Sequence, residues 1–163
     1  MLEAISLWLH QTPAGEFLLT MLISMIPIVE LRGGVPAGVA MGLPIPTALL
    51  AAVLGNMIPV PFIILFIRRL FKWIRVHIPR LGSFVSRLEQ RAYAKSRNVD
   101  RYALWGLLLL VAVPLPGTGA WTGSLVAALM DLRLKRAMPV IFTGVVIAGL
   151  IMTALTYGVT SVL

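Results

Sequence analysis

Long apolar stretches separated by short polar segments organise the chain. Two of them, residues 46–67 and 138–163, run without a charged residue or an interrupting motif. An α-helix rises 1.5 Å per residue, so about 20 apolar residues cross a hydrocarbon core of about 30 Å. Both stretches meet this length, and the pattern therefore predicts two membrane-spanning helices.

Two further apolar stretches, residues 17–43 and 102–130, are interrupted near their centres. The first interruption is Glu-Leu-Arg-Gly-Gly-Val-Pro at residues 30–36, and the second is Pro-Leu-Pro-Gly-Thr-Gly at residues 114–119. Proline removes a backbone donor, and glycine raises the entropic cost of a helix. We therefore expect two short helices in each stretch, and each of them reaches only about halfway across a membrane.

The basic residues favour re-entrant hairpins over kinked spans. Ten of the fourteen Lys and Arg residues lie within 68–101, and three more lie within 133–136. If residues 102–130 crossed the bilayer, these two basic segments would face opposite sides, against the positive-inside rule. We expect both segments in the cytoplasm. The connector 68–101 then forms one or two amphipathic helices at the membrane interface, or simply a solvated connector that fixes topology.

The two halves of the chain have the same order of elements. Residues 16–67 and 102–163 each contain a hairpin followed by a span, in opposite orientations. The predicted fold class is an all-α polytopic membrane protein in which residues 1–163 form one integral membrane domain. Its architecture is an inverted repeat of a re-entrant helical hairpin plus a transmembrane helix, with cytoplasmic amphipathic helices between the repeats.

Small residues at a spacing of four follow each interruption: Gly34, Gly38 and Gly42 in the first half, and Gly119, Gly123 and Ala127 in the second. Ridges of small residues let helix backbones approach closely in lipid. We therefore expect the inner half-helices of the two hairpins to pack against each other. The plainer explanation is that glycine is frequent in membrane helices.

Composition agrees with a membrane protein. Apolar residues make up 59% of the chain and charged residues 12%, with a mean hydropathy of +0.94 and a net charge of +8. A soluble domain carries about twice this charged fraction, and basic clusters confined to loops argue against nucleic-acid binding. The chain has no cysteine, no cluster with metal-ligand spacing and no dinucleotide or phosphate-loop fingerprint. We expect no metal, no cofactor and no enzymatic activity.

Glu30 and Arg32 are the ionisable residues placed within the apolar stretches at membrane depth. Such residues are costly there and mark transport pathways. A carboxylate buried without a partner can carry a proton at physiological pH, so Glu30 is the candidate for proton coupling. A direct bond between Glu30 and Arg32 requires unwound backbone, because residues two apart on a helix do not face each other, and Gly33 and Gly34 permit such unwinding. An ion pair that only fixes the hairpin tip is the alternative.

The second interruption adds backbone donors. Gly117, Thr118 and Gly119 lead into a helix whose first N–H groups and dipole favour an anion, and Pro36 suits the first turn of the matching helix in the first half. Discontinuous helices hold substrates and coupling ions in this way in inverted-repeat transporters. We expect the substrate to contact these backbone groups together with the Arg32 guanidinium, Gly33, Gly34 and Trp121. Alternatively, these residues only turn the chain.

Residues 27–36 and 114–123, with Trp121 in the string Pro-Gly-Thr-Gly-Ala-Trp, resemble the family called putative small multidrug export proteins over nearly the whole chain. That family is similar to the DedA (VTT-domain) superfamily. The resemblance implies two re-entrant hairpins in inverted repeat and proton-dependent translocation of polyprenyl-phosphate lipids, or lipid scrambling. It implies that Glu30 matches the acidic residue of the first hairpin. DedA proteins typically carry an arginine in the second hairpin, whereas residues 115–122 here contain no charge.

These observations together predict a multi-pass inner-membrane transporter. We expect a homodimer, because two spans leave little protein to cover two hairpins. The first hypothesis is proton-coupled flipping of an anionic lipid such as polyprenyl phosphate, with Arg32 and the amides of residues 117–120 on the phosphate. The second is proton-coupled export of small cationic drugs bound by Glu30. The third is a non-transporting assembly factor or a scramblase, with membrane lipids as the partners.

Overall fold

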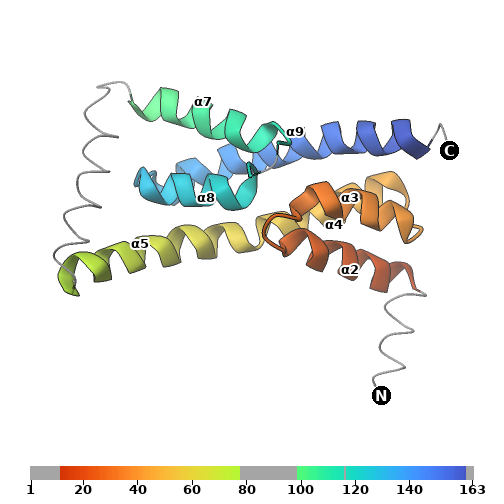
Figure 1. Cartoon of the computed structure of the whole chain (residues 1–163), viewed down its shortest axis with the longest axis horizontal. Helices are drawn as coiled ribbons and strands as arrows, with labels where there is room; N and C mark the ends of the chain where they lie inside the picture. Colours follow the sequence, from red (N-terminus) through yellow and green to blue (C-terminus); the bar gives the residue numbers. More distant parts are fainter. Residues whose placement is uncertain (1–11, 78–98, 116, 161–163) are drawn as a thin grey trace, which may run out of the picture.

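A computed structural model describes residues 12–77, 99–115 and 117–160. All regular structure in these residues is α-helical, which confirms the predicted all-α class (Figure 1). The helices are α2 (Pro13–Met25), α3 (Glu30–Ala40), α4 (Ile45–Met57), α5 (Pro59–His77), α7 (Val99–Ala112), α8 (Ala120–Leu129) and α9 (Leu134–Thr160).

Two long helical segments run through the molecule. Ile58 keeps helical dihedral angles (φ −56°, ψ −49°), so α4 continues into α5 and the two form one rod (Figure 1). The ranges Ile45–Leu70 and Leu134–Gly158 are long and apolar enough to cross a membrane, with mean hydropathies of 2.3 and 2.2. They overlap the two stretches that the sequence predicts to span.

Large apolar side chains face outward from these rods. Phe62 is 69% exposed on α5, and Leu150 is 55% exposed on α9. The buried positions instead hold small or branched residues such as Ala51, Val60 and Val145. Apolar side chains exposed at this density suit lipid as the surrounding solvent better than water.

Helices α2 and α3 form a closely packed hairpin. A Cβ on Gly38 would lie 2.8 Å from the Thr20 hydroxyl oxygen of α2 and 2.9 Å from Ala48 of α4. Gly34 faces Ser24 of α2 and Ala52 of α4 in the same way. The glycines therefore let α3 approach both neighbours, as expected for small residues in membrane helices.

The predicted helix break at residues 30–36 is wrong. Gly33, Gly34 and Pro36 all lie inside α3, and the chain turns at residues 26–29 instead. Left-handed dihedrals at Ile28 (φ 77°) and Glu30 (φ 49°) reverse the chain direction there. Close packing against α2 and α4 outweighs the low helix propensity of the glycines. As a result, α3 begins at Glu30 and not at Pro36.

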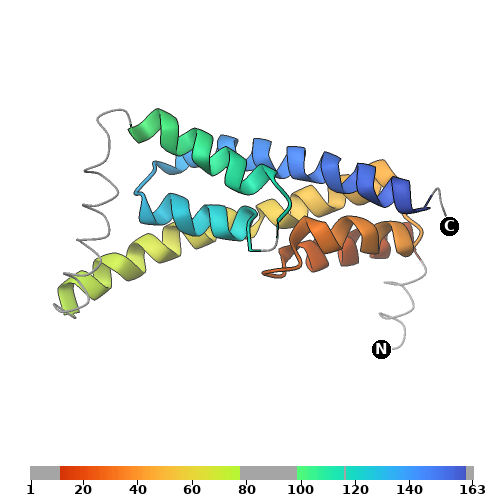
Figure 2. The ribbon, with the colours of Figure 1, turned by 45° about the horizontal axis from the view of Figure 1, so that its top comes forward.

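Helices α7 and α8 form a second, more open hairpin around the loop 113–119, where the sequence predicts a break. Helix α7 packs mainly on α9, and α8 packs mainly on α5. Gly117 (φ 82°) and Gly119 (φ 126°) provide left-handed backbone in this loop. The turns of the two hairpins meet near the middle of the bundle (Figure 2).

The predicted packing of α3 against α8 is wrong. Gly34 and Gly38 face α2 and α4, whereas Gly123 faces Val111 of α7 and Ile141 of α9. The small residues therefore allow close contact between the helices of each hairpin and their own neighbours, and not between α3 and α8. Gly42 (φ 107°) lies in the turn after α3, Gly119 precedes α8, and Ala127 is fully buried in the common core.

The basic connector begins as a continuation of the long rod. The sequence predicts a new amphipathic helix from residue 68, but α5 continues to His77. No glycine or proline occurs from Phe62 to Ile78, so nothing in the sequence interrupts the helix there. The rest of the predicted connector, residues 78–98, lies outside the described residues.

Candidate functional site

Glu30 is the first residue of α3 and reaches across to the other hairpin. Its side chain is almost fully buried, with the residue 4% exposed. Carboxylate Oε1 accepts a hydrogen bond from the Trp121 backbone N–H at 3.0 Å. Glu30 thus caps α8 from a different helix, which favourably places a negative charge at the positive end of the helix dipole.

Gly119 makes room for this cap. It is the residue before α8 and has no side chain of its own to bond the free amides. A Cβ at this position would overlap the Glu30 carboxylate, and its φ of 126° disfavours any side chain. The anion position that the sequence predicts at this helix start is therefore occupied by Glu30 itself.

Arg32 binds the loop of the second hairpin. One terminal nitrogen donates to the Thr118 carbonyl oxygen at 2.6 Å and to the Thr118 hydroxyl at 2.7 Å, and the other donates to the Leu115 carbonyl. The planar guanidinium reaches these acceptors together, as the fork of an arginine allows.

Glu30 and Arg32 do not pair with each other. Among the described residues the ion pair joins Arg68 and Asp131, with 3.6 Å between nitrogen and oxygen. Because α3 is helical through Arg32, side chains two positions apart point in different directions. Each charge instead bonds groups of the second hairpin.

Thr118 and Trp121 complete the contact between the hairpins. The Thr118 hydroxyl lies 2.7 Å from the Val113 carbonyl to which it donates, so it also closes its own loop. The Trp121 indole Nε1 donates to the Met25 carbonyl at 3.1 Å, at the end of α2. Each hairpin therefore satisfies backbone groups at a helix end of the other.

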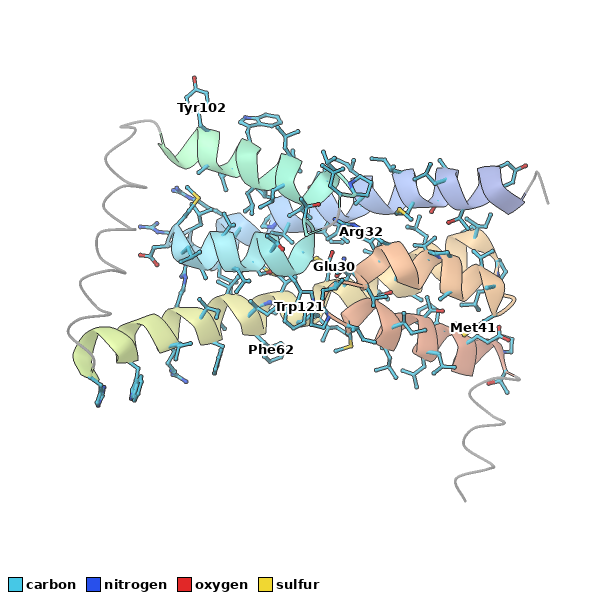
Figure 3. The ribbon with its side chains drawn as sticks, viewed as in Figure 1. Glu30, Arg32, Met41, Phe62, Tyr102 and Trp121 are labelled. Atoms are coloured by element: carbon cyan, nitrogen blue, oxygen red, sulfur yellow. The ribbon has the colours of Figure 1, made fainter. Side chains whose placement is uncertain are left out.

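We call Glu30, Arg32, Thr118, Gly119 and Trp121 the hairpin latch. Figure 3 shows Glu30, Arg32 and Trp121 gathered where the two turns meet, between the long rods. The latch consists mostly of hydrogen bonds to backbone groups, and α3 makes little direct contact with α8.

Asn56 of α4 lies beside the latch and is not among the site residues that the sequence predicts. It is fully buried, and neither its amide nitrogen nor its amide oxygen has a hydrogen-bond partner. Together with Glu30, Arg32 and Gly119 it lines a closed pocket that has no room for a water molecule. A useful sequence signal is that this amide stands in an otherwise almost wholly apolar span.

The other predicted substrate-binding residues lie away from this pocket or only shape the backbone. Gly33 faces Val29, and Gly34 faces Ser24 inside the first hairpin. Gly117 has no neighbour that an added Cβ would meet, and its carbonyl accepts the Thr122 hydroxyl at 2.9 Å. Within the described ranges no group of three or more His, Cys, Asp or Glu residues could hold a metal ion.

The apolar rods and the outward apolar side chains indicate a membrane protein, and all regular structure in its described residues is helical. A family described as "Putative small multi-drug export protein" matches residues 30–151, and the chain belongs to this family. The match begins at Glu30 and includes every latch residue. No curated protein matches the chain. No solved structure matches it either. The similarity to the DedA superfamily stays a prediction.

Proposed function

We propose that this protein is a non-enzymatic inner-membrane transporter of amphipathic substrates and that the hairpin latch is its gate. The observation that carries the proposal is that Glu30 and Arg32, both placed at membrane depth by the sequence, bind the other hairpin and not each other. Charged residues at that depth are costly and are kept for function. Membership in a multidrug export family supports transport as the activity.

In this proposal the two hairpins are re-entrant and enter from opposite leaflets, as halves of an inverted repeat. The basic connector lies in the cytoplasm, in agreement with the positive-inside rule. The protein works as a homodimer, because two long helices leave the hairpins open on their lipid sides. Meeting of the two turns near the bundle centre supports this topology (Figure 2).

Protonation of Glu30 would loosen the latch. A neutral carboxyl group loses the charge that favours its place at the start of α8, while the amides of Ala120 and Trp121 remain. Asn56 provides a second driving force toward opening, because both of its amide atoms lack partners in the closed arrangement. Leaving a buried polar group unpaired costs about 1–3 kcal/mol.

An anionic substrate can open the latch through Arg32. Phosphate oxygens and the carbonyls of Leu115 and Thr118 are all acceptors, so a phosphate can replace the loop without leaving the guanidinium unpaired. This favours an anionic lipid such as polyprenyl phosphate, or lipid scrambling. The family description favours small drugs, and a cationic drug would instead bind Glu30 after the latch opens. An assembly factor would keep the latch closed.

Reconstituted liposomes distinguish these functions. Polyprenyl-phosphate flipping and dye export are measured under a pH gradient for the normal chain, Glu30→Gln and Arg32→Ala, with Glu16→Gln as the control acid outside the latch. We expect at least one activity in the normal chain. Glu30→Gln should lose its response to the gradient, and Arg32→Ala should lose lipid flipping. Full activity of both variants would overturn the gate, and no activity in any assay would favour an assembly factor.

A further inference from the structure

A groove of about 990 Å³ lies on the lipid-facing side of the bundle, along α5. Its walls are apolar and come from α5, the end of α2 and the start of α8. Residues that define it are Met25 and Trp121 at one end, Phe62 and Phe66 along the wall, and Arg68 and Arg69 at the other end.

The wall of the groove is one stripe of α5. Phe62, Phe66 and Arg69 are spaced by four and three residues, which places them on one face of the helix. Phe62 is 69% exposed and Phe66 66% exposed, and Figure 3 shows Phe62 pointing away from the other helices. An apolar stripe on a membrane-spanning helix faces acyl chains.

The stripe ends in two guanidinium groups with different surroundings. Arg68 is fixed by Asp131 at 3.6 Å and by the Leu132 carbonyl, and its buried Nε has no partner. Arg69 is exposed and forms no ion pair within the described residues. No acidic side chain lines the groove. Asp131 offsets the charge of Arg68, so Arg69 is the group that attracts an anion at this end.

We propose that the groove binds one anionic, phosphate-bearing lipid, with the headgroup at Arg69, next to the Asp131-paired Arg68, and an acyl chain along α5 toward Trp121. The distance from Ile58 to Arg69 along the helix is about 16 Å, which suits an acyl chain. This proposal rests on the proposed function, and it gives that function a substrate class and an entry route from the membrane.

The inner end of the groove touches the latch. Trp121 and Met25 line the groove, and the bond between the indole Nε1 and the Met25 carbonyl joins the two hairpins. A lipid tail that reaches this end lies directly against a latch contact. The headgroup site at Arg69 differs from the one at Arg32 that the sequence predicts. The donors of Arg32 are occupied in this arrangement, whereas Arg69 forms no ion pair within the described residues.

Trp121 fluorescence tests the proposal. Trp8, Trp73 and Trp105 are replaced by phenylalanine in the full chain, which leaves Trp121 as the reporter. The protein is reconstituted in phosphatidylcholine vesicles that contain brominated phosphatidylglycerol or brominated phosphatidylcholine. We expect the anionic lipid to reach half-maximal quenching at about fivefold lower mole fraction, which corresponds to about 1 kcal/mol, the attraction of one arginine to an anionic lipid surface.

Charge variants distinguish lipid binding in the groove from a general attraction of the basic protein to an anionic membrane. Arg69→Gln should abolish the preference for the brominated anionic lipid. Lys135→Gln, which removes an exposed base outside the groove, should retain it. Equal quenching by both lipids in the normal chain would overturn the proposal, as would a preference that survives in Arg69→Gln.

A second copy of the chain is the rival occupant. With Phe62→Cys in this cysteine-free protein, efficient disulfide formation between copies together with absent quenching would show that a dimer covers the groove, against the proposal.

The proposals for the gate and for the groove can fail independently of each other. A lipid preference combined with unchanged transport in Glu30→Gln and Arg32→Ala would support the groove and contradict the gate. Equal quenching by both lipids combined with lost transport in these variants would support the gate and contradict the groove.

Discussion

The two hairpins follow the same order in the chain but are held in different ways. In the first, α2 and α3 pack on each other through Gly34 and Gly38, and the hydroxyls of Thr20 and Ser24 bond the backbone of their own helix at 2.8 Å. In the second, α7 and α8 lie on different long helices and have less contact with each other.

This difference assigns different tasks to the hairpins. The first packs closely together with α4 and presents Glu30 and Arg32 from α3. The loop of the second is held from outside by these residues and inside by Thr118. We therefore expect latch variants to release the second hairpin and to leave the first unchanged.

The largest effect is expected for Gly119→Ala. The new Cβ displaces the Glu30 carboxylate and also meets a backbone with φ of 126°, so stability should fall by about 3 kcal/mol or more. Gly117→Ala is the matched control, because its φ of 82° imposes backbone strain with no neighbour to displace; its loss should be about 1 kcal/mol. Thermal unfolding in detergent measures both. Equal losses would mean that Glu30 does not depend on Gly119.

Arg32→Gln should destabilise the protein by about 2 kcal/mol, since it removes charged hydrogen bonds to the loop. Hydrogen exchange followed by mass spectrometry should show faster exchange in residues 113–123 and unchanged exchange in α2. Arg32→Lys keeps the charge but not the fork, so it should rescue only part of the protection. Faster exchange in both hairpins to the same extent would break the comparison between them.

Asn56→Leu should act in the opposite direction. Replacing an unpaired buried amide by an apolar side chain of similar shape should raise stability by about 1–2 kcal/mol. If Asn56 finds its partners only when the latch opens, the same variant should slow transport in liposomes. A stabilised variant with normal transport would make Asn56 irrelevant to opening.

Trp121→Phe should have the smallest effect, a loss of about 1 kcal/mol, because it removes a single hydrogen bond to the Met25 carbonyl and keeps most of the aromatic contact. Trp105→Phe, at an exposed position on α7, is the control and should leave the unfolding midpoint unchanged. A loss for Trp121→Phe no larger than that of the control would remove this bond from the latch.

Much of the fold follows from local pattern, whereas the latch does not. Uninterrupted apolar length predicts the two spanning rods, and Pro and Gly at 114–119 locate the second turn. The sequence places the first turn wrongly, because Gly33 and Gly34 resemble helix breakers, whereas packing against α2 and α4 holds Gly34 in α3. The charge pattern selects Glu30 and Arg32 as important.

The local sequence pattern cannot predict which groups these two charged side chains bind. Arg32 bonds residues 83 and 86 positions away, and these acceptors are mostly backbone atoms that carry no mark in the sequence. Asn56 gives a signal only in hindsight, because a single amide in a long apolar helix is usually satisfied by a neighbour. Long-range backbone recognition is therefore where the structure adds most.

The central claim is that the hairpins separate at the latch during transport. The chain has no cysteine, so spin labels can be attached uniquely at Ile28→Cys and Leu115→Cys, which are 92% and 56% exposed near the two turns. Pulsed electron paramagnetic resonance in vesicles should give one short distance in the resting protein. A second, longer distance should appear on acidification or addition of the transported lipid, and it should already be present in Glu30→Gln. A single unchanged distance under all of these conditions would contradict the account.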